Sequence, residues 1–178
     1  CIADGDLTHF MEVIKGAPFE NLFLVDIFTG LRQGELLGLR WSNIDFEKGC
    51  ITIDRQLYMP PKGGSYTLEP LKNRRTRMIT PAPFVFTLLK RERTKQLQNR
   101  LQAGNMWNEG DLKGRVFTNE FGRYLSHKTV YKHFKKAVEA TYTDISYDRN
   151  DYQQSFYDFK KVKNLLYSPT ENKIVLSR

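Results

Sequence analysis

The chain has 178 residues, of which 40% are hydrophobic and 13% aromatic, enough for one domain with a buried core and too many for wholesale disorder. Basic residues outnumber acidic ones by 28 to 20, and the net charge of +8 favours a polyanionic partner, most often nucleic acid. Two cysteines, no apolar run of about 18 residues and no signal peptide argue against a disulfide framework, a metal cluster, a membrane span and secretion.

These features predict a soluble, cytoplasmic, basic domain with no membrane partner. The chain opens with Cys1 and not with Met, so we also expect it to be a piece of a longer protein.

The first third of the chain reads as helical. Residues 8–16 have the pattern of a short amphipathic helix, and Pro18 is a suitable start for a second one. Residues 22–28 are apolar except for one aspartate, so this second helix should be buried nearly all round. Gly30 is a plausible end for it, and residues 33–39 predict a further short helix.

The middle of the chain changes to a strand pattern. Residues 50–58 are rich in β-forming side chains with apolar residues at a spacing of two. Residues 66–71 and 76–79 predict two more strands, joined by a basic turn. We expect the three to form one antiparallel sheet.

The rest of the pattern is again mainly helical. Residues 82–102 predict a long helix that is apolar at its start and basic in its second half, and residues 127–140 predict another. A short strand is expected at residues 116–118. The predicted fold class is therefore α+β, mainly α-helical with a small three-stranded antiparallel sheet.

The positive charge is concentrated in residues 55–100. This segment has eleven basic residues against only Glu69 and Glu92, a surplus of nine, and the remainder is close to neutral. Such concentration favours a binding surface. A solvated helix face next to an exposed turn would give the same count.

Arg32 is the first candidate site residue, in the motif TGLRQGELLGLRW. Glu35 follows three positions later, where a carboxylate can hold the guanidinium in one orientation. An arginine anchored in this way can bind a phosphate through two parallel hydrogen bonds. An ordinary surface ion pair at a helix start would have the same spacing.

Lys72 is the second candidate, in the motif LKNRRTRMITP. A lysine at the tip of a β-hairpin can reach into a groove of a duplex, and beside a phosphodiester it can donate a proton to a departing oxygen. A solvent-exposed basic turn is the alternative interpretation.

Together and in this order, the buried helix, the two motifs, the following helix and the VFT…G segment resemble the catalytic domain of tyrosine recombinases. The resemblance is above all to integrases of phages and conjugative transposons, and it covers roughly residues 1–140. It implies a site-specific recombinase of a mobile element that acts on double-stranded DNA.

The resemblance also implies a mechanism without metal or cofactor. In this family a tyrosine attacks the scissile phosphate and stays attached to a 3′ phosphate, two arginines neutralise the growing charge, and a hairpin lysine protonates the leaving 5′ oxygen. Arg32 matches the first arginine, Lys72 the lysine, and Glu35 a supporting acidic position.

The resemblance further implies DNA-binding residues on the same face. Those we assign to the sugar–phosphate backbone are Arg74, Arg75, Arg77 and Lys128. Family members form tetramers on DNA, whereas we expect this chain to be a monomer in solution.

The family's second catalytic half is not recognisable. It requires a His-x-Leu-Arg-His box, a further His or Trp and the nucleophilic Tyr, but the chain has only His9, His127 and His133. We interpret His133 as a surface histidine of an amphipathic helix. Arg149 is a candidate relic of the second arginine.

Residues 141–178 are therefore expected to be a diverged or truncated tail of unknown role, after an integrase-like region at 1–140. The tail offers several hydroxyls, none in a context that marks the nucleophile: Tyr147, Tyr152, Tyr157 and Tyr167. Such a chain should bind DNA but cleave it poorly or not at all.

Two other functions remain open. The chain can be a non-catalytic DNA-binding module that uses the basic hairpin and helix 82–102, or a basic globular domain with no nucleic-acid role.

Overall fold

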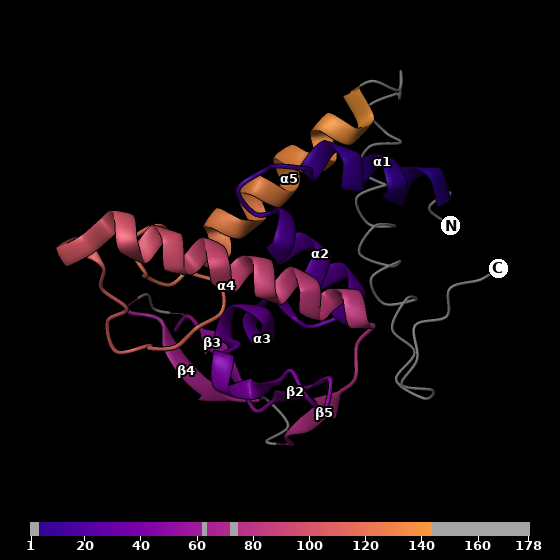
Figure 1. Cartoon of the computed structure of the whole chain (residues 1–178). Coiled ribbons are helices and arrows are strands. Elements are labelled where there is room, and N and C mark those ends of the chain that lie inside the picture. The colour runs from indigo at the N-terminus through magenta and orange to yellow at the C-terminus, as the bar shows by residue number, and fades with distance from the viewer. Residues whose placement is uncertain (1–3, 62–63, 72–74, 144–178) are drawn as a thin grey trace. The chain divides into compact units, whose positions relative to one another are not determined.

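The computed structural model describes residues 4–61, 64–71 and 75–143 (Figure 1). They divide into two compact units, one drawn from residues 4–30 and 128–143 and the other from the described residues of 31–127. The predicted nucleophile candidates and Arg149 lie outside the described residues. Within the described part of the chain, no helix is long and apolar enough to cross a membrane.

The described part of the first unit is formed by the helices α1 (Asp4–Ile14), α2 (Glu20–Thr29) and α5 (His127–Thr143). An aromatic cluster joins them: the Phe134 ring centroid lies 5.8 Å from that of Phe10 and 5.6 Å from that of Phe23. Rings at such distances pack edge to face and add to the energy of burial. The amphipathic patterns at residues 8–16 and 127–140 therefore correspond to real helices with slightly shifted ends.

Helix α2 begins at Glu20, two residues after the proline expected to start it. Buried side chains recur along it from Leu22 to Thr29, as its apolar sequence predicts. Gly30 ends the helix with a φ of 62°, a left-handed conformation that favours glycine, and its N–H bonds to the Asp26 carbonyl at 3.0 Å. The predicted end at Gly30 is confirmed.

The second unit holds the short helix α3 (Gln33–Gly38), the 3₁₀ turns η1 (Trp41–Asn43) and η2 (Gly104–Met106), and the long helix α4 (Pro83–Ala103). Pro83 occupies the first turn of α4, where its missing N–H costs nothing. The buried side of α4 lies at its amino-terminal half, and this agrees with the apolar start predicted for the helix.

Among the described residues, two small antiparallel sheets, not one, make up the β structure. β2 (Cys50–Ile53) lies between β1 (Ile44–Asp45) and β5 (Arg77–Ile79), while β3 (Arg55–Tyr58) pairs with β4 (Thr67–Pro70). The fold class, a mainly helical α+β domain with a three-stranded antiparallel sheet, is confirmed, but the predicted strand membership is wrong.

The physical reason is a break at Asp54, within the run that was expected to be one strand. The Asp54 carboxylate accepts a hydrogen bond from Arg40 Nη2 at 2.8 Å and another from Asn43 Nδ2 at 2.9 Å. These contacts fix Asp54 between β2 and β3, which then pair with different partners. The strands before and after residues 72–74, which lie outside the described residues, consequently belong to different sheets and do not form the expected hairpin.

Helix α3 packs directly on the backbone of β3, and Figure 1 shows the two elements side by side. A Cβ added at Gly38 would lie 2.8 Å from Leu57 N, and one at Gly34 would lie 3.0 Å from Leu57 O. The two glycines of the RQGELLG segment therefore allow this helix to approach the strand closely. This approach sets the position of the residues at the start of α3.

The segment after α4 is mostly loop. The expected strand at residues 116–118 is wrong, because only isolated bridges form there, between Arg40 and Arg115 and between Thr118 and Tyr124. The loop is fixed by Glu109, whose carboxylate accepts hydrogen bonds from the Gly114 N–H at 2.7 Å and from Trp107 Nε1 at 3.1 Å.

Candidate functional site

The site begins at the start of α3, where Arg32 is the residue before the first helical position. Its backbone is extended, with φ −67° and ψ 147°, and Glu35 stands three residues later. Glu35 Oε2 accepts a hydrogen bond from the Arg32 N–H at 3.0 Å. A carboxylate at this position satisfies a backbone donor that the helix leaves free, and it lies at the positive end of the helix.

The same carboxylate binds two guanidinium groups. Arg32 Nη1 lies 3.1 Å from Glu35 Oε1, while Arg77 approaches from β5 with Nη1 at 3.0 Å from Oε1 and Nη2 at 2.6 Å from Oε2. The Arg77 contact is bidentate, the strongest geometry for such a pair. Glu35 is thus the centre of an arrangement that joins α3 to β5.

Burial differs sharply among the three side chains. Glu35 is 1% exposed, Arg77 33% and Arg32 77%. The carboxylate is therefore a fixed, internal anchor, and most of the Arg32 guanidinium faces solvent. An exposed guanidinium held at one edge can still offer hydrogen-bond donors to a phosphate.

The Glu35 carboxyl remains ionised at neutral pH. Burial alone would raise its pKa, but the hydrogen bonds and charge of Arg77, together with the bonds from Arg32, hold that pKa below its usual value. The net charge of the three groups is consequently +1, which favours binding of an anion.

Only some of the other predicted site residues lie in the described part of the chain. Lys72 and Arg74 lie outside the described residues, and Arg75 is exposed just before β5. Lys128 is exposed near the start of α5 and belongs to the first unit. The DNA contact expected for Arg77 stays a prediction, and its observed partner, Glu35, was not foreseen.

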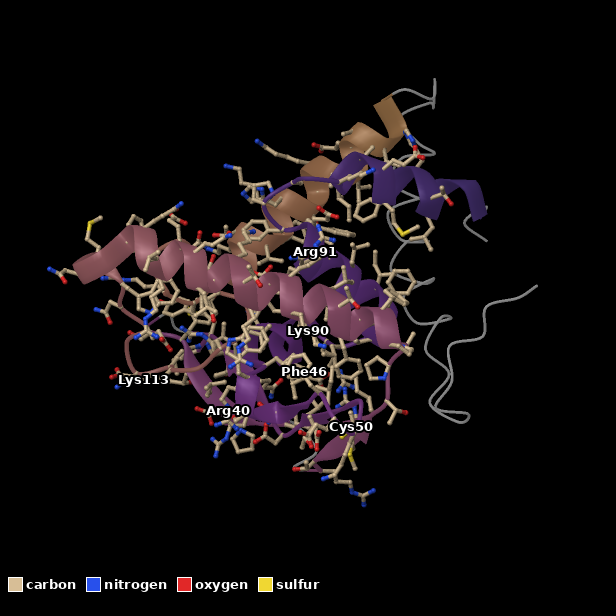
Figure 2. All side chains as sticks on the ribbon, in the orientation of Figure 1. Arg40, Phe46, Cys50, Lys90, Arg91 and Lys113 are labelled. Carbon is tan, nitrogen blue, oxygen red and sulfur yellow. The ribbon has the colours of Figure 1, made fainter. Side chains whose placement is uncertain are left out.

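Helix α4 carries exposed basic residues on its second and third turns. The Lys90 ammonium lies 5.8 Å from the centre of the Phe46 ring, and the Arg93 guanidinium lies 5.6 Å from that of Trp41. Figure 2 shows Lys90 on the side of α4 toward Phe46, and it also labels Arg91, which is likewise exposed. These contacts hold part of the basic segment against the protein surface.

Arg115 is a buried cation that the sequence pattern did not single out. It is 1% exposed, its guanidinium lies 5.6 Å from the centre of the Tyr124 ring, and none of its side-chain nitrogens has a hydrogen-bond partner among the described residues. Burial lowers its pKa to about 10, opposed by the nearby Glu109 carboxylate. No motif surrounds it that could have marked it.

The histidines are all partly buried. His127 is partly buried, which lowers its pKa, and its backbone N–H donates to the Tyr66 hydroxyl at 3.1 Å. His133 on α5 is partly exposed, and its ring centroid lies 4.6 Å from that of Phe19.

The described structure thus combines a mainly helical α+β fold with an arginine anchored at the start of a short helix. The chain belongs to the phage integrase family, whose model matches residues 6–154. The resemblance inferred from the two motifs is confirmed.

Curated relatives agree with this family. The chain is 34% identical over 144 residues to a tyrosine recombinase XerC-like protein of Caldanaerobacter subterraneus subsp. tengcongensis, which covers 76% of this chain and 37% of the relative. It is 40% identical over 66 residues to the prophage integrase IntR of Escherichia coli K12, or 34% of this chain and 16% of that one. The chain thus spans well under half the length of these relatives.

Solved structures share the fold. The Tn1549 transposon integrase in complex with transposon right end DNA matches with a TM-score of 0.67 at 18% identity, over 98% of this chain and 56% of that one. The XerH site-specific recombinase bound to its difH substrate matches with a TM-score of 0.53 at 22% identity, over 84% of this chain and 38% of that one.

Proposed function

We propose that this chain forms part of the active site of a site-specific DNA recombinase or integrase, in which Arg32 and Lys72 act on one phosphodiester of double-stranded DNA. Family membership supports this proposal, as do the names of the relatives and the DNA bound in the matching structures. The single observation that carries it is the exposed Arg32 guanidinium tethered to the buried Glu35 carboxylate.

The proposed chemistry is strand cleavage through a phosphotyrosine. A tyrosine oxygen bonds to phosphorus as its proton passes to water, the bond from phosphorus to the 5′ oxygen breaks, and Lys72 gives that oxygen a proton. Arg32 neutralises charge that grows on the non-bridging oxygens, and Glu35 keeps Arg32 in place. The reverse reaction rejoins the strand, because the covalent phosphotyrosine link conserves the energy of the phosphodiester bond.

Further parts of the proposal concern the surroundings of this site. Arg74, Arg75 and Lys128 contact the sugar–phosphate backbone and position the duplex without reading its sequence. The backbone contact predicted for Arg77 would compete with its two hydrogen bonds to Glu35. Residues 1–140 form the integrase-like region and residues 141–178 the tail. We also place the chain in the cytoplasm, where its DNA substrate lies, as a monomer in the absence of DNA.

Salt-dependent binding tests the role of Arg32. The affinity for a duplex is measured by fluorescence anisotropy at several salt concentrations for the wild type, Arg32→Ala and the control Arg123→Ala, which removes another exposed arginine outside the basic segment. Loss of one phosphate contact should lower the slope of log affinity against log salt by about 0.9 for Arg32→Ala only. An unchanged slope for Arg32→Ala would contradict the proposal.

The second candidate function is a non-catalytic DNA-binding module. The exposed basic residues of α4 favour it, since they can bind phosphates without any chemistry. A nicked duplex carrying the recombination site separates the two functions through a denaturant-resistant protein–DNA adduct. We expect this chain to bind the duplex and to form little adduct, and Arg32→Ala to abolish what adduct forms. Binding of the duplex without any adduct would support the module.

A further inference from the structure

We propose that Arg77 is a positioning residue for Arg32: by binding both oxygens of the buried Glu35 carboxylate, it leaves Arg32 tethered at one edge only and available to a phosphate. This inference rests on the proposed function for the phosphate, whereas the coupling between the two arginines rests on the contacts alone. It assigns to Arg77 a role that differs from its predicted contact with the DNA backbone.

Arg77 and Arg32 share the Glu35 carboxylate unequally. Arg77 makes two hydrogen bonds to Glu35, at 3.0 and 2.6 Å, and the Arg32 side chain makes one, at 3.1 Å. The second oxygen also accepts the Arg32 backbone N–H at 3.0 Å. The orientation of the carboxylate is therefore fixed mainly by Arg77 and by the backbone, and the Arg32 side chain takes the remaining position.

Without Arg77, the Glu35 carboxylate would lose two of its hydrogen bonds. At 1% exposure it has no access to bulk water that could replace a lost partner. The Arg32 guanidinium, at 77% exposure, already bonds one oxygen of Glu35 at 3.1 Å, and it would turn inward to bind both oxygens. An arginine turned inward presents fewer donors to a phosphate. Arg77 thus keeps Arg32 exposed by occupying the competing site.

Arginine and lysine should act differently at position 77. A guanidinium matches a carboxylate with two parallel hydrogen bonds, while a lysine ammonium acts as a point charge. If the role of Arg77 is to occupy both oxygens, Arg77→Lys should fail to restore the arrangement although it keeps the charge. If the role is a simple phosphate contact, lysine should serve almost as well.

The test first uses the chain without DNA. Nuclear magnetic resonance of the Arg32 Nε–H and Nη–H groups is compared among the wild type, Arg77→Met, Arg77→Lys and the matched control Arg75→Met, two residues away and exposed. We expect the Arg32 signals to shift and to exchange more slowly with water in both Arg77 variants and to stay unchanged in Arg75→Met. Unchanged Arg32 signals in the Arg77 variants would overturn the inference. If Arg77→Met does not fold, the Arg32 signals of Arg77→Lys are compared with those of the wild type, and unchanged signals would again overturn the inference.

The second measurement is a double-mutant cycle in duplex binding. We expect Arg32→Met to weaken binding in the wild type but to have little further effect in the Arg77→Met background, because Arg32 has already turned inward. Additive losses with unmoved Arg32 signals would make Arg77 an independent phosphate contact and overturn the inference. If Arg32→Met has no effect on binding while the Arg32 signals still respond to Arg77, the proposed function fails and the positioning contact stands.

Discussion

Glu35 is the residue on which the site depends, and the sequence anticipated only half of its contacts. The three-residue spacing from Arg32 predicts their pairing because the two positions are neighbours at a helix start. Arg77 lies 42 residues away in the chain, and its bidentate contact arises only when β5 lies beside α3. A local pattern cannot reveal a partner that tertiary structure brings in.

Replacing Glu35 by Gln should destabilise the protein and weaken its response to acid. At neutral pH we expect a loss of about 2 kcal/mol in the free energy of unfolding, typical of hydrogen bonds to charged groups. The folded-state pKa of Glu35 lies below the usual 4.5, so its stabilising contribution is complete above that value and is lost as pH falls through the folded pKa. Urea unfolding at a series of pH values measures this.

The difference between the wild type and Glu35→Gln should therefore shrink as the pH falls below about 4.5. Glu47→Gln, at an exposed glutamate, serves as the control and should change stability little at any pH. A difference that stayed constant on acidification would mean that the Glu35 charge contributes nothing.

At the level of secondary structure, helices were predicted more accurately than strands. Gly30, Pro83 and the amphipathic patterns mark helix ends and faces locally, and each has a counterpart in the structure. Residues 50–58 look like one strand by composition, but Asp54 is held by Arg40 and Asn43, so the run divides between two sheets. Strand pairing depends on contacts distant in sequence, which explains the error.

Helix α3 packs closely on β3, and of its two glycines Gly38 is the one where an added Cβ would lie nearer the strand. Alanine normally stabilises a helix interior by about 1 kcal/mol relative to glycine. Here the added Cβ would meet backbone atoms of Gln56 and Leu57 at 2.8 to 3.0 Å, so Gly38→Ala should instead destabilise by about 1 to 3 kcal/mol. Chemical denaturation measures the change.

Gly34→Ala provides a graded comparison, since its nearest contact is 3.0 Å and the next 3.6 Å. We expect a smaller loss than for Gly38→Ala, together with weaker DNA binding in both variants if α3 moves Arg32. Stabilisation by Gly38→Ala would show that the helix does not lie so near the strand.

Asp54 is the residue that holds the corner between β2 and β3. Asp54→Ala should lower the free energy of unfolding by about 1 kcal/mol, because Arg40 and Asn43 lose a shared partner at a partly exposed position. Asp54→Asn keeps the shape and should lose less. Thermal unfolding of the two variants tests this, and equal stability of Asp54→Ala and the wild type would leave the strand break unexplained.

At the level of the whole molecule, the binding surface predicted from the charge count stays a prediction. The surplus of nine positive charges in residues 55–100 predicted a binding surface, and the described basic residues of α4 in that segment are mostly exposed. Family membership also followed from two motifs, because their order and spacing are specific. The division into two units and the buried Arg115 did not follow, since no local signal marks either.

The proposed function requires that Arg32 and Lys72 act on the same phosphodiester of bound DNA. Duplexes of the recombination site, each with a single phosphate replaced by a neutral methylphosphonate, are bound to the wild type, Arg32→Ala and Lys72→Ala. The wild type should lose affinity most at one position, by about tenfold if a contact of roughly 1.4 kcal/mol is lost, and both variants should lose their sensitivity at that same position. Loss of sensitivity at two separate phosphates, or at none, would contradict the account.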